Sequence, residues 1–308
     1  MLTQVLGIVE AEGWFDTKQP FEKSIYLSQG SSQCVLLSRN GQPDTFVKFT
    51  DLINLASEAT RCRQSHERFP RHTARFLGYA KRHSLEVLAT RAVSFLPVSG
   101  SMMLATKLGG AAQVGLEGFF RRMSECGAET NACRQGHEWF EDLRAYFDGH
   151  ALQPAAAMGL PRLSQALQSL PPLPQHGDLV LNNLGLRPDR GLVVFDWEDY
   201  GAVNLPGLDL FTLENSIRQD VDPRLVSGPS PVSKHGLDVG KLAAALGLSQ
   251  QMYEELKLSY ALVFRYLKRN YNAEVRARLD ELIHGMAGAI ARNETQDGAE
   301  SHDEQVRQ

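Results

Sequence analysis

Short β-prone runs alternate with turn residues over the first part of the chain. "SIYL", "QCVLL" and "DTFVKF" are separated by "SQGSS" and "SRNGQP", and the second spacer contains the Asn-Gly pair typical of hairpins. Two further runs, "ARFLGYAKR" and "SLEVLATRAV", follow. This pattern predicts a five-stranded antiparallel sheet, preceded by a helix at 2–12 and followed by a hinge in "SFLPVSG" (94–100).

A stretch free of glycine and proline lies between the third and fourth predicted strands. The apolar positions that share one helical face are Leu52, Leu55, Ala59 and Cys62. Asp51 precedes them and is a plausible N-cap, because an Asp side chain can accept a free N–H of the first turn. The sequence therefore predicts a helix at 52–67 inserted into the sheet.

From residue 101 onward the pattern is mostly helical. The expected helices span 101–125, 137–150, 158–170, 207–218, 238–246, 249–271 and 273–292. A segment rich in Ser, Pro and Gly at 220–236 indicates a mobile loop. The polar tail at 294–308 predicts disorder, because it has too few apolar residues to bury. Strands followed by helices favour an α+β fold.

Composition narrows the classes of partner. The 308 residues are 43% hydrophobic and 22% charged, with a net charge of -4. Proteins that bind nucleic acid usually carry an excess of basic residues, and this chain does not, so we do not expect nucleic acid as its partner. It has no basic leader and no apolar run of about 20 residues, so we expect a cytoplasmic protein without a membrane anchor. Four scattered cysteines indicate free thiols and not a zinc site or disulfides.

One hairpin collects polar side chains at its open end. "LGL" (184–186) and "LVVF" (192–195) flank the turn "RPDRG". If these runs pair from the turn outward, Asn183 and Asp196 emerge together, within reach of one cation. Amide and carboxylate oxygens suit Mg²⁺, which usually completes its shell with water and substrate phosphates. The hairpin therefore predicts a magnesium site.

The loop before this hairpin carries a further carboxylate. Asp178 stands five residues before Asn183, the spacing at which kinases separate the Asp that accepts a hydroxyl proton from the Asn that holds metal. We therefore predict Asp178 as the catalytic residue. For His176 we favour a structural hydrogen bond, because phosphoryl transfer through a loose transition state requires no strong base.

The turn after the first predicted strand is suited to phosphate. In "SQGSSQ", Gly30 permits close approach of the backbone, and the amides and hydroxyls of Ser31 and Ser32 can meet phosphate oxygens. This short motif is weak alone. Its position ahead of a lysine-bearing strand makes it a candidate nucleotide loop.

The third predicted strand carries that lysine. Lys48 alternates with Val47 and Phe49, so it points to the opposite face. Glu58 on the next helix can hold it toward phosphates, as the strand-helix ion pair of kinases does, and Glu67 is an alternative partner. The alternative is that Lys48 lies on an exposed face of the strand and contacts only solvent.

These motifs together resemble the aminoglycoside phosphotransferase and choline kinase family. "HGDLVLNN" matches its His-x-Asp-x-x-x-x-Asn loop, "FDWE" its metal-binding Asp, and "GLDLF" a downstream segment whose Asp, here Asp209, has a structural role. The resemblance implies a bilobal protein-kinase-like fold, with a nucleotide-binding lobe at 1–97 and a helical lobe at 98–308. It further implies ATP or GTP as donor, Mg²⁺ as cofactor, and a small hydroxyl compound as acceptor.

Two departures from protein kinases favour a small-molecule acceptor. Val180 replaces the lysine that usually follows the catalytic Asp by two residues, and "DWE" replaces Asp-Phe-Gly. A catalytically silent nucleotide-binding regulator and a protein kinase stay as alternatives. Glu198 and Asp199 can reach a second metal or the acceptor, or face solvent. Amino sugars, sugars and amino alcohols are all open as acceptors, as is the choice of nucleotide.

Overall fold

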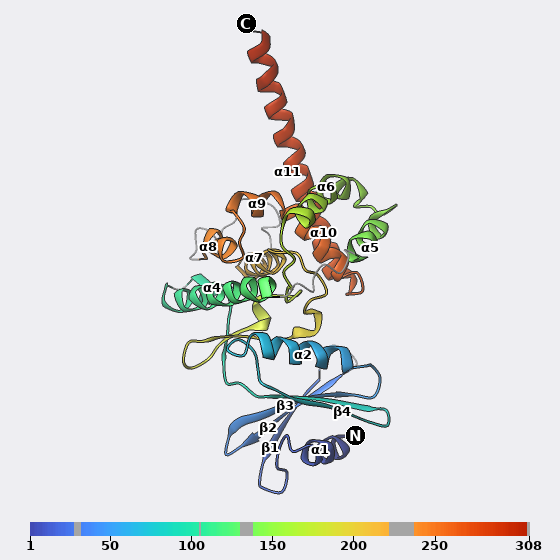
Figure 1. Ribbon diagram of the computed structural model, residues 1–308, viewed down its shortest axis with the longest axis vertical. Coiled ribbons are helices and arrows are strands. Elements are labelled where there is room, and N and C mark those ends of the chain that lie inside the picture. Colours follow the sequence, from blue (N-terminus) through green and yellow to red (C-terminus); the bar gives the residue numbers. More distant parts are fainter. Residues whose placement is uncertain (28–31, 105, 130–137, 222–236, 307–308) are drawn as a thin grey trace.

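A five-stranded antiparallel sheet forms one end of the molecule. The computed structural model describes the backbone of residues 1–27, 32–104, 106–129, 138–221 and 237–306. The strands are β1 (Glu22–Leu27), β2 (Gln33–Arg39), β3 (Gln42–Thr50), β4 (Phe76–Arg82) and β5 (Leu85–Arg91). They lie in the order β1-β2-β3-β5-β4, and every neighbouring pair is antiparallel, which confirms the predicted sheet (Figure 1).

Different helices cover the two faces of this sheet (Figure 1). The predicted first helix is α1 (Leu2–Ala11), and it shares a buried apolar cluster with Val47 and Phe49 of β3. On the other face, α2 (Ala56–Arg68) packs through Ala59 on Leu88 of β5. Since alternate side chains of a strand point to opposite faces, Lys48 lies on the face that α2 covers.

The start of α2 differs from the prediction. The helix begins four residues later than expected, and its N-cap residue is Leu55 instead of Asp51. The Thr50 hydroxyl accepts the N–H of Leu52 at 3.0 Å, so the chain bends before the helix begins. The side chain of Leu52, placed by periodicity on the buried face, is 76% exposed. Local side-chain hydrogen bonds have here overridden the apolar spacing.

The rest of the chain is mainly helical, as predicted. Its helices are α3 (Gly100–Leu104), α4 (Thr106–Glu129), α5 (Glu138–Phe147), α6 (Gln153–Ser169), α7 (Leu208–Val221), α8 (Val239–Ala245), α9 (Gln250–Glu255), α10 (Lys257–Leu267) and α11 (Ala273–Val306). Two expected helices, 101–125 and 249–271, are each divided into two. Helix α6 begins earlier than expected because Pro154 is accommodated in its first turn. Most of the predicted loop at 220–236 lies outside the described residues.

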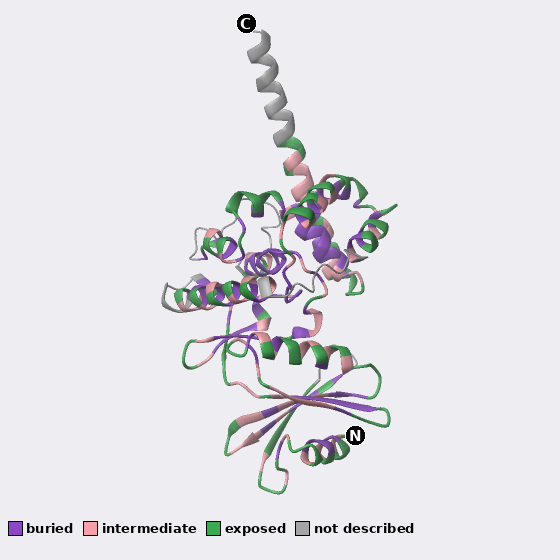
Figure 2. Cartoon of the chain, in the orientation of Figure 1, coloured by how far each residue is buried: buried purple, intermediate pink, exposed green. Residues whose placement is uncertain are grey.

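A small second sheet connects the two regions. The expected hinge contains β6 (Leu96–Pro97), which pairs with β7 (Leu184–Leu186), and β7 pairs with β8 (Leu192–Val194). Around this sheet the helices enclose a large apolar core, distinct from the cluster under α1. Figure 2 shows buried residues concentrated in the middle of the helical region and in the large sheet. The second sheet therefore lies at the junction between two cores.

The described backbone of helix α11 runs on into the tail at 294–308, for which disorder stays a prediction. Helix α11 continues to Val306 and projects from the helical region, while 307–308 lie outside the described residues (Figure 1). Continuing an established helix adds one hydrogen bond for each residue, and the polar tail contains no proline to stop it. In the described part of the chain, no helix has both the length and the apolar character needed to cross a membrane.

Three of the four cysteines lie in the described part of the chain. Cys34, Cys62 and Cys126 are free thiols, and Cys34 and Cys126 are buried. Cys133 lies outside the described residues. None of the three described cysteines forms a disulfide.

One buried carboxylate ties the sheet to the start of α2, and its removal gives a first test. Glu86 of β5 accepts the N–H of Leu55 at 2.6 Å, the hydroxyl of Tyr79 at 2.9 Å and the ammonium of Lys81 at 2.7 Å. We expect Glu86→Ala to lower the free energy of unfolding by about 2–3 kcal/mol, because the buried N–H of Leu55 and the hydroxyl of the half-buried Tyr79 lose their acceptor. Urea unfolding followed by circular dichroism measures this.

The matched control for this test is Glu141→Ala. Glu141 is 70% exposed in its side chain and contacts only Arg144 among the described salt bridges. Its removal is expected to change the free energy of unfolding by less than about 0.5 kcal/mol. Equal effects of the two substitutions would contradict the anchoring role of Glu86.

Candidate functional site

The predicted hairpin has the predicted register. Leu186 pairs with Leu192 and Leu184 with Val194. One step beyond, the N–H of Phe195 donates to the carbonyl of Asn183 at 2.9 Å. Asp196 follows directly and takes a left-handed backbone conformation, with φ of 61°. The hairpin therefore brings the two predicted metal ligands to the same end, and the left-handed residue ends the strand there.

The loop before the hairpin fixes the orientation of the Asn183 side chain. Its amide nitrogen donates to the carbonyl of Asp178 at 2.9 Å. With the nitrogen so engaged, the amide oxygen is the atom available to a cation. An amide oxygen beside the carboxylate of Asp196 is a donor set that fits Mg²⁺, which needs only a few protein ligands.

His176 braces this loop in a single protonation state. It is fully buried; its Nδ1 accepts the N–H of Asp178 at 3.3 Å, and its Nε2 donates to the carbonyl of Phe195 at 2.8 Å. These two partners require a neutral ring that carries its proton on Nε2. Burial lowers the pKa of His176 to about 4, which agrees with that state. The predicted structural hydrogen bond is confirmed.

Asp209 fixes the backbone of the same loop. This residue lies in the first turn of α7, and its carboxylate accepts hydrogen bonds from the N–H of His176 at 2.6 Å and the N–H of Gly177 at 2.9 Å. Gly177 has φ of 87°, and a Cβ there would lie 2.8 Å from the Cβ of Asp199. Only glycine therefore fits beside Asp199 at this point of the loop without strain. The structural role that the resemblance implies for Asp209 is confirmed.

On the sheet side, Lys48 is paired as predicted. Its ammonium contacts both carboxylate oxygens of Glu58, at 2.9 and 2.8 Å. It also lies 3.8 Å from a carboxylate oxygen of Glu198. Burial lowers the pKa of Lys48, but Glu58 and then Glu198 outweigh that effect, so the net pKa is raised. The partner on α2 is thus Glu58, and Glu67 is the alternative that the structure does not select.

The segment after Asp196 contacts both regions of the chain. In the 3-10 turn η3 (Trp197–Asp199), the carbonyl of Glu198 accepts a hydrogen bond from Arg61 of α2. Burial raises the pKa of Asp196, and Lys48 opposes this. Burial also raises the pKa of Glu198, and Asp196 adds to the effect. The two carboxylates are thus close enough to influence each other, while the described residues include no cluster of three or more His, Cys, Asp or Glu side chains that could hold a metal ion.

Sequence reasoning missed one residue of this site. Lys268, the C-cap of α10, contacts Asp178 at 3.0 Å and Asp199 at 3.5 Å, and it is only 2% exposed. Positions 258 to 266 of α10 are all buried, so a cation at the end of this helix requires a partner, but no local pattern identifies Asp178 or Asp199 as that partner. Burial raises the pKa of Asp178, and Lys268 opposes the rise.

The predicted nucleotide loop is described only in part. Gly30 and Ser31 lie outside the described residues, and Ser32 is buried directly before β2. The predicted phosphate contacts of all three therefore stay predictions.

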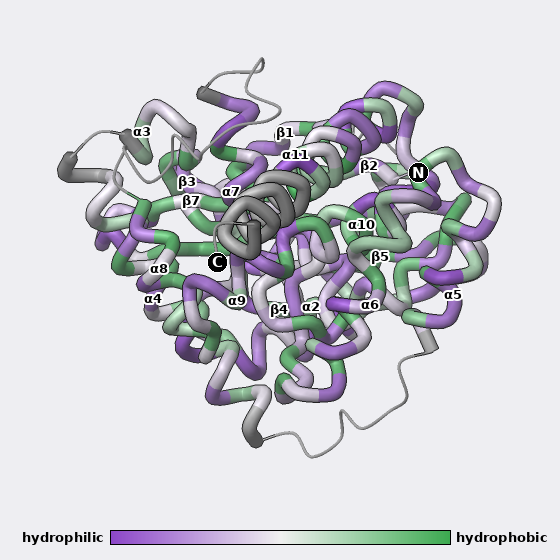
Figure 3. The backbone as a smooth tube through the Cα atoms, turned by 90° about the horizontal axis from the view of Figure 1, so that it is seen from above, coloured by the Kyte–Doolittle hydropathy of each residue, from purple (hydrophilic) through white to green (hydrophobic). Residues whose placement is uncertain are grey.

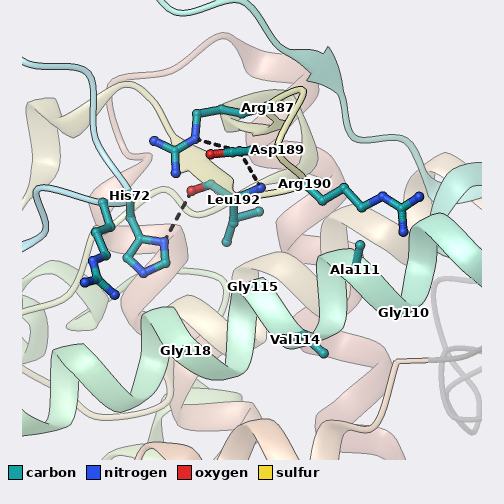
Figure 4. Close-up of a pocket in the computed structure, with 12 residues that line it drawn as sticks. His72, Gly110, Ala111, Val114, Gly115, Gly118, Arg187, Asp189, Arg190 and Leu192 are labelled. Atoms are coloured by element: carbon teal, nitrogen blue, oxygen red, sulfur yellow. Dashed lines mark hydrogen bonds and ion pairs between the residues drawn. The ribbon is translucent and has the colours of Figure 1, made fainter.

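A cavity of about 560 Å³ lies elsewhere, between α4 and the turn joining β7 to β8 (Figure 4). Arg71, Arg187 and Arg190 contribute positive charge, and Gly110 and Gly115 are on the helix side. Its lining includes none of the predicted site residues. We therefore place the candidate site at the hairpin and not in this cavity.

The neutral buried state of His176 predicts a pH dependence of stability. Its pKa is about 4 in the folded chain against 6.5 for the free side chain, so the unfolded chain binds more protons as the pH falls. We expect this group to lower the free energy of unfolding between pH 6.5 and 4, by roughly 3 kcal/mol in full. Chemical denaturation across this range measures it.

His176→Gln is the comparison for this slope. The variant is expected to be less stable at pH 7 but to lose this part of the decline toward pH 4. An unchanged decline in the variant would show that other groups cause it.

Comparisons with known proteins agree on the fold. No family profile and no curated protein matches the chain. Among solved structures, aminoglycoside phosphotransferase APH(3'')-Id from Streptomyces rimosus is 20% identical with a TM-score of 0.53, over 92% of this chain and 98% of its own. Choline kinase LicA from Streptococcus pneumoniae is 13% identical with a TM-score of 0.60, over 93% and 99%.

A third match is aminoglycoside phosphotransferase APH(4)-Ia, with 14% identity and a TM-score of 0.57, over 92% of this chain and 99% of its own. A thermostable mutant of that protein is known in a ternary complex with AMP-PNP and hygromycin B. At these identities the likeness concerns the fold. The chain therefore has the α+β, kinase-like fold of aminoglycoside phosphotransferases and choline kinase, as its motifs predict.

Proposed function

We propose that the protein is a small-molecule kinase that transfers the γ-phosphate of ATP or GTP to a hydroxyl group. The observation that carries this is the position of Lys48 between two carboxylates. Glu58 comes from α2, and Glu198 comes from the segment that begins with Asp196. A lysine that steadies phosphates is thereby held beside the predicted metal ligand, which is the arrangement that phosphoryl transfer requires.

In this mechanism, Asn183 and Asp196 would hold Mg²⁺ through the amide oxygen and the carboxylate. When bound, the ion neutralises charge on the phosphates and orients them. Lys48 supplies a second positive charge at the phosphates, and Glu58 prevents its ammonium from turning to solvent. We assign Gly30, Ser31 and Ser32 to the nucleotide loop on their sequence.

Asp178 acts at the acceptor. The acceptor oxygen forms a bond to the γ-phosphorus while the bond from that phosphorus to the β-γ bridging oxygen breaks, and ADP or GDP leaves with the electron pair. The hydroxyl proton passes to the Asp178 carboxylate and then to solvent. Because the His176 ring and the Asn183 amide both bind the backbone of Asp178, the carboxylate is presented from a fixed loop.

The ligands of the structural neighbours support a nucleotide donor and a small acceptor. APH(4)-Ia mutants are known with ADP and hygromycin B and with AMP-PNP and hygromycin B, and LicA is known with AMP. Val180 and the "DWE" segment favour a small acceptor over a protein. We also propose the division into lobes at 1–97 and 98–308, and a cytoplasmic location that suits free thiols and a nucleotide donor.

The decisive experiment is a screen with labelled nucleotide. The full chain is incubated with Mg²⁺ and γ-labelled ATP or GTP, together with a metabolite extract, hygromycin B or choline, and new phosphorylated species are identified by mass spectrometry. A phosphorylated small hydroxyl compound supports the proposal. Label found only on protein serine or threonine would indicate a protein kinase, and nucleotide binding without transfer would indicate a silent regulator.

Two substitutions separate chemistry from metal binding. Asp178→Asn should lower turnover by about 100-fold or more while leaving the stabilisation by Mg-AMP-PNP nearly unchanged, because Asp178 acts on the acceptor proton. Turnover is measured as ADP formation, and stabilisation as the shift in melting temperature.

Asp196→Ala should give the opposite pattern in the binding measurement. Without that carboxylate the shift in melting temperature with Mg-AMP-PNP should be largely lost, since a direct metal ligand is missing. A full shift in Asp196→Ala, or near-normal turnover in Asp178→Asn, would remove the corresponding residue from its assigned role.

A further inference from the structure

Lys268 is a buried cation at the end of an apolar helix. Helix α10 packs against α6, α7 and α11, and Figure 3 shows it among these helices in the helical region. The ammonium contacts the Asp178 carboxylate at 3.0 Å, the Asp199 carboxylate at 3.5 Å and the hydroxyl of Tyr271 at 3.1 Å. It also lies 4.4 Å from the centroid of the Tyr271 ring. All three donors of the ammonium therefore have an acceptor.

Burying an ammonium group is unfavourable unless its partners compensate. The three contacts supply that compensation and hold the ammonium of Lys268 in one place. Through the ammonium of Lys268, the end of α10 is joined to the loop that carries Asp178.

The catalytic loop itself lacks a lysine near the carboxylate. Val180 stands two residues after Asp178, where protein kinases carry lysine. In this chain the cation comes instead from α10 and reaches Oδ2 of Asp178. The Asp178 side chain keeps 18% exposure, so it still has access to the acceptor side.

We propose that Lys268 is a positioning residue for phosphoryl transfer, which fixes one oxygen of Asp178 so that the other faces the acceptor hydroxyl. The inference rests on the proposed function and adds a residue that the motifs do not contain. Asp199 and Tyr271 act behind it, because they restrict the ammonium to the position from which it meets Asp178. Loss of the ammonium leaves the carboxylate free to rotate away from the attacking oxygen.

The test uses the full-length chain with water as the acceptor, so that no natural acceptor is needed. In this reaction the water oxygen bonds to the γ-phosphorus, ADP leaves, and the water proton passes to Asp178 and then to solvent. Initial rates of ADP formation with Mg-ATP give kcat and KM. Binding of Mg-AMP-PNP is measured separately from the shift in melting temperature.

Lys257→Met is the matched control for Lys268→Met. Both lysines belong to the ends of α10 and have mostly buried side chains paired with carboxylates, but Lys257 contacts Glu214 and Glu254, away from the loop at 178. Lys268→Met should lower kcat by about 10- to 100-fold with KM for ATP changed less than about 2-fold, because only the orientation of Asp178 is lost. Lys257→Met should lower the melting temperature and leave kcat within about 2-fold.

Two further variants keep the test decisive. Lys268→Arg, which retains the charge, should recover part of kcat. In an Asp178→Asn background, Lys268→Met should have almost no additional effect, because its action passes through the missing carboxylate. If Lys268→Met is insoluble, Lys268→Gln and Asp199→Asn replace it, and each should also lower kcat with KM unchanged.

The outcomes separate this inference from the proposed function. A kcat of Lys268→Met equal to that of Lys257→Met, or an equal loss in the Asp178→Asn background, overturns the positioning role alone. Absence of ADP formation by the parent protein, with water and in the acceptor screen, overturns the proposed function and the inference with it. A selective loss of kcat that arginine partly restores supports both.

Discussion

The carboxylate of Asp209 is the contact on which the site geometry depends. It accepts the N–H groups of His176 and Gly177 from the first turn of α7 and so fixes the start of the loop. The His176 ring then connects this loop to the second strand of the hairpin. One ring nitrogen accepts the N–H of Asp178, and the other donates to the carbonyl of Phe195. One buried helix end thus positions a predicted catalytic carboxylate and the residue before a predicted metal ligand.

The sheet reaches this centre through α2. Lys48 can meet the segment after Asp196 only because the helix that supplies Glu58 also packs on that segment. Phe69, which follows α2, stacks on Trp197 with ring centroids 5.5 Å apart, and Arg61 donates to the carbonyl of Glu198. Displacement of α2 would therefore separate the ion pair from the metal loop, which is a physical route by which sheet stability influences the site.

Local patterns predicted most of this molecule. Alternation along β3 placed Lys48 correctly, and the turn at 187–191 fixed the hairpin register, because both depend on neighbours in sequence. The late start of α2 was missed because Thr50 and Glu86 bind backbone N–H groups that a helix would otherwise have used. Lys268 was missed because its partners lie 90 and 69 residues earlier, and no local pattern encodes such a contact.

Glu198 stands where protein kinases have the glycine of Asp-Phe-Gly, and the turn η3 gives this side chain and that of Asp199 separate partners. A 3-10 turn has about three residues per turn, so neighbouring side chains point in directions about 120° apart. Glu198 accordingly reaches Lys48 of the sheet, while Asp199 reaches Lys268 of α10. Each of these two lysines is therefore held by one carboxylate of η3 and one predicted functional partner, Glu58 or Asp178. A glycine at 198 would supply no carboxylate, and the coupling between the sheet and the metal loop would then rest on backbone and aromatic contacts.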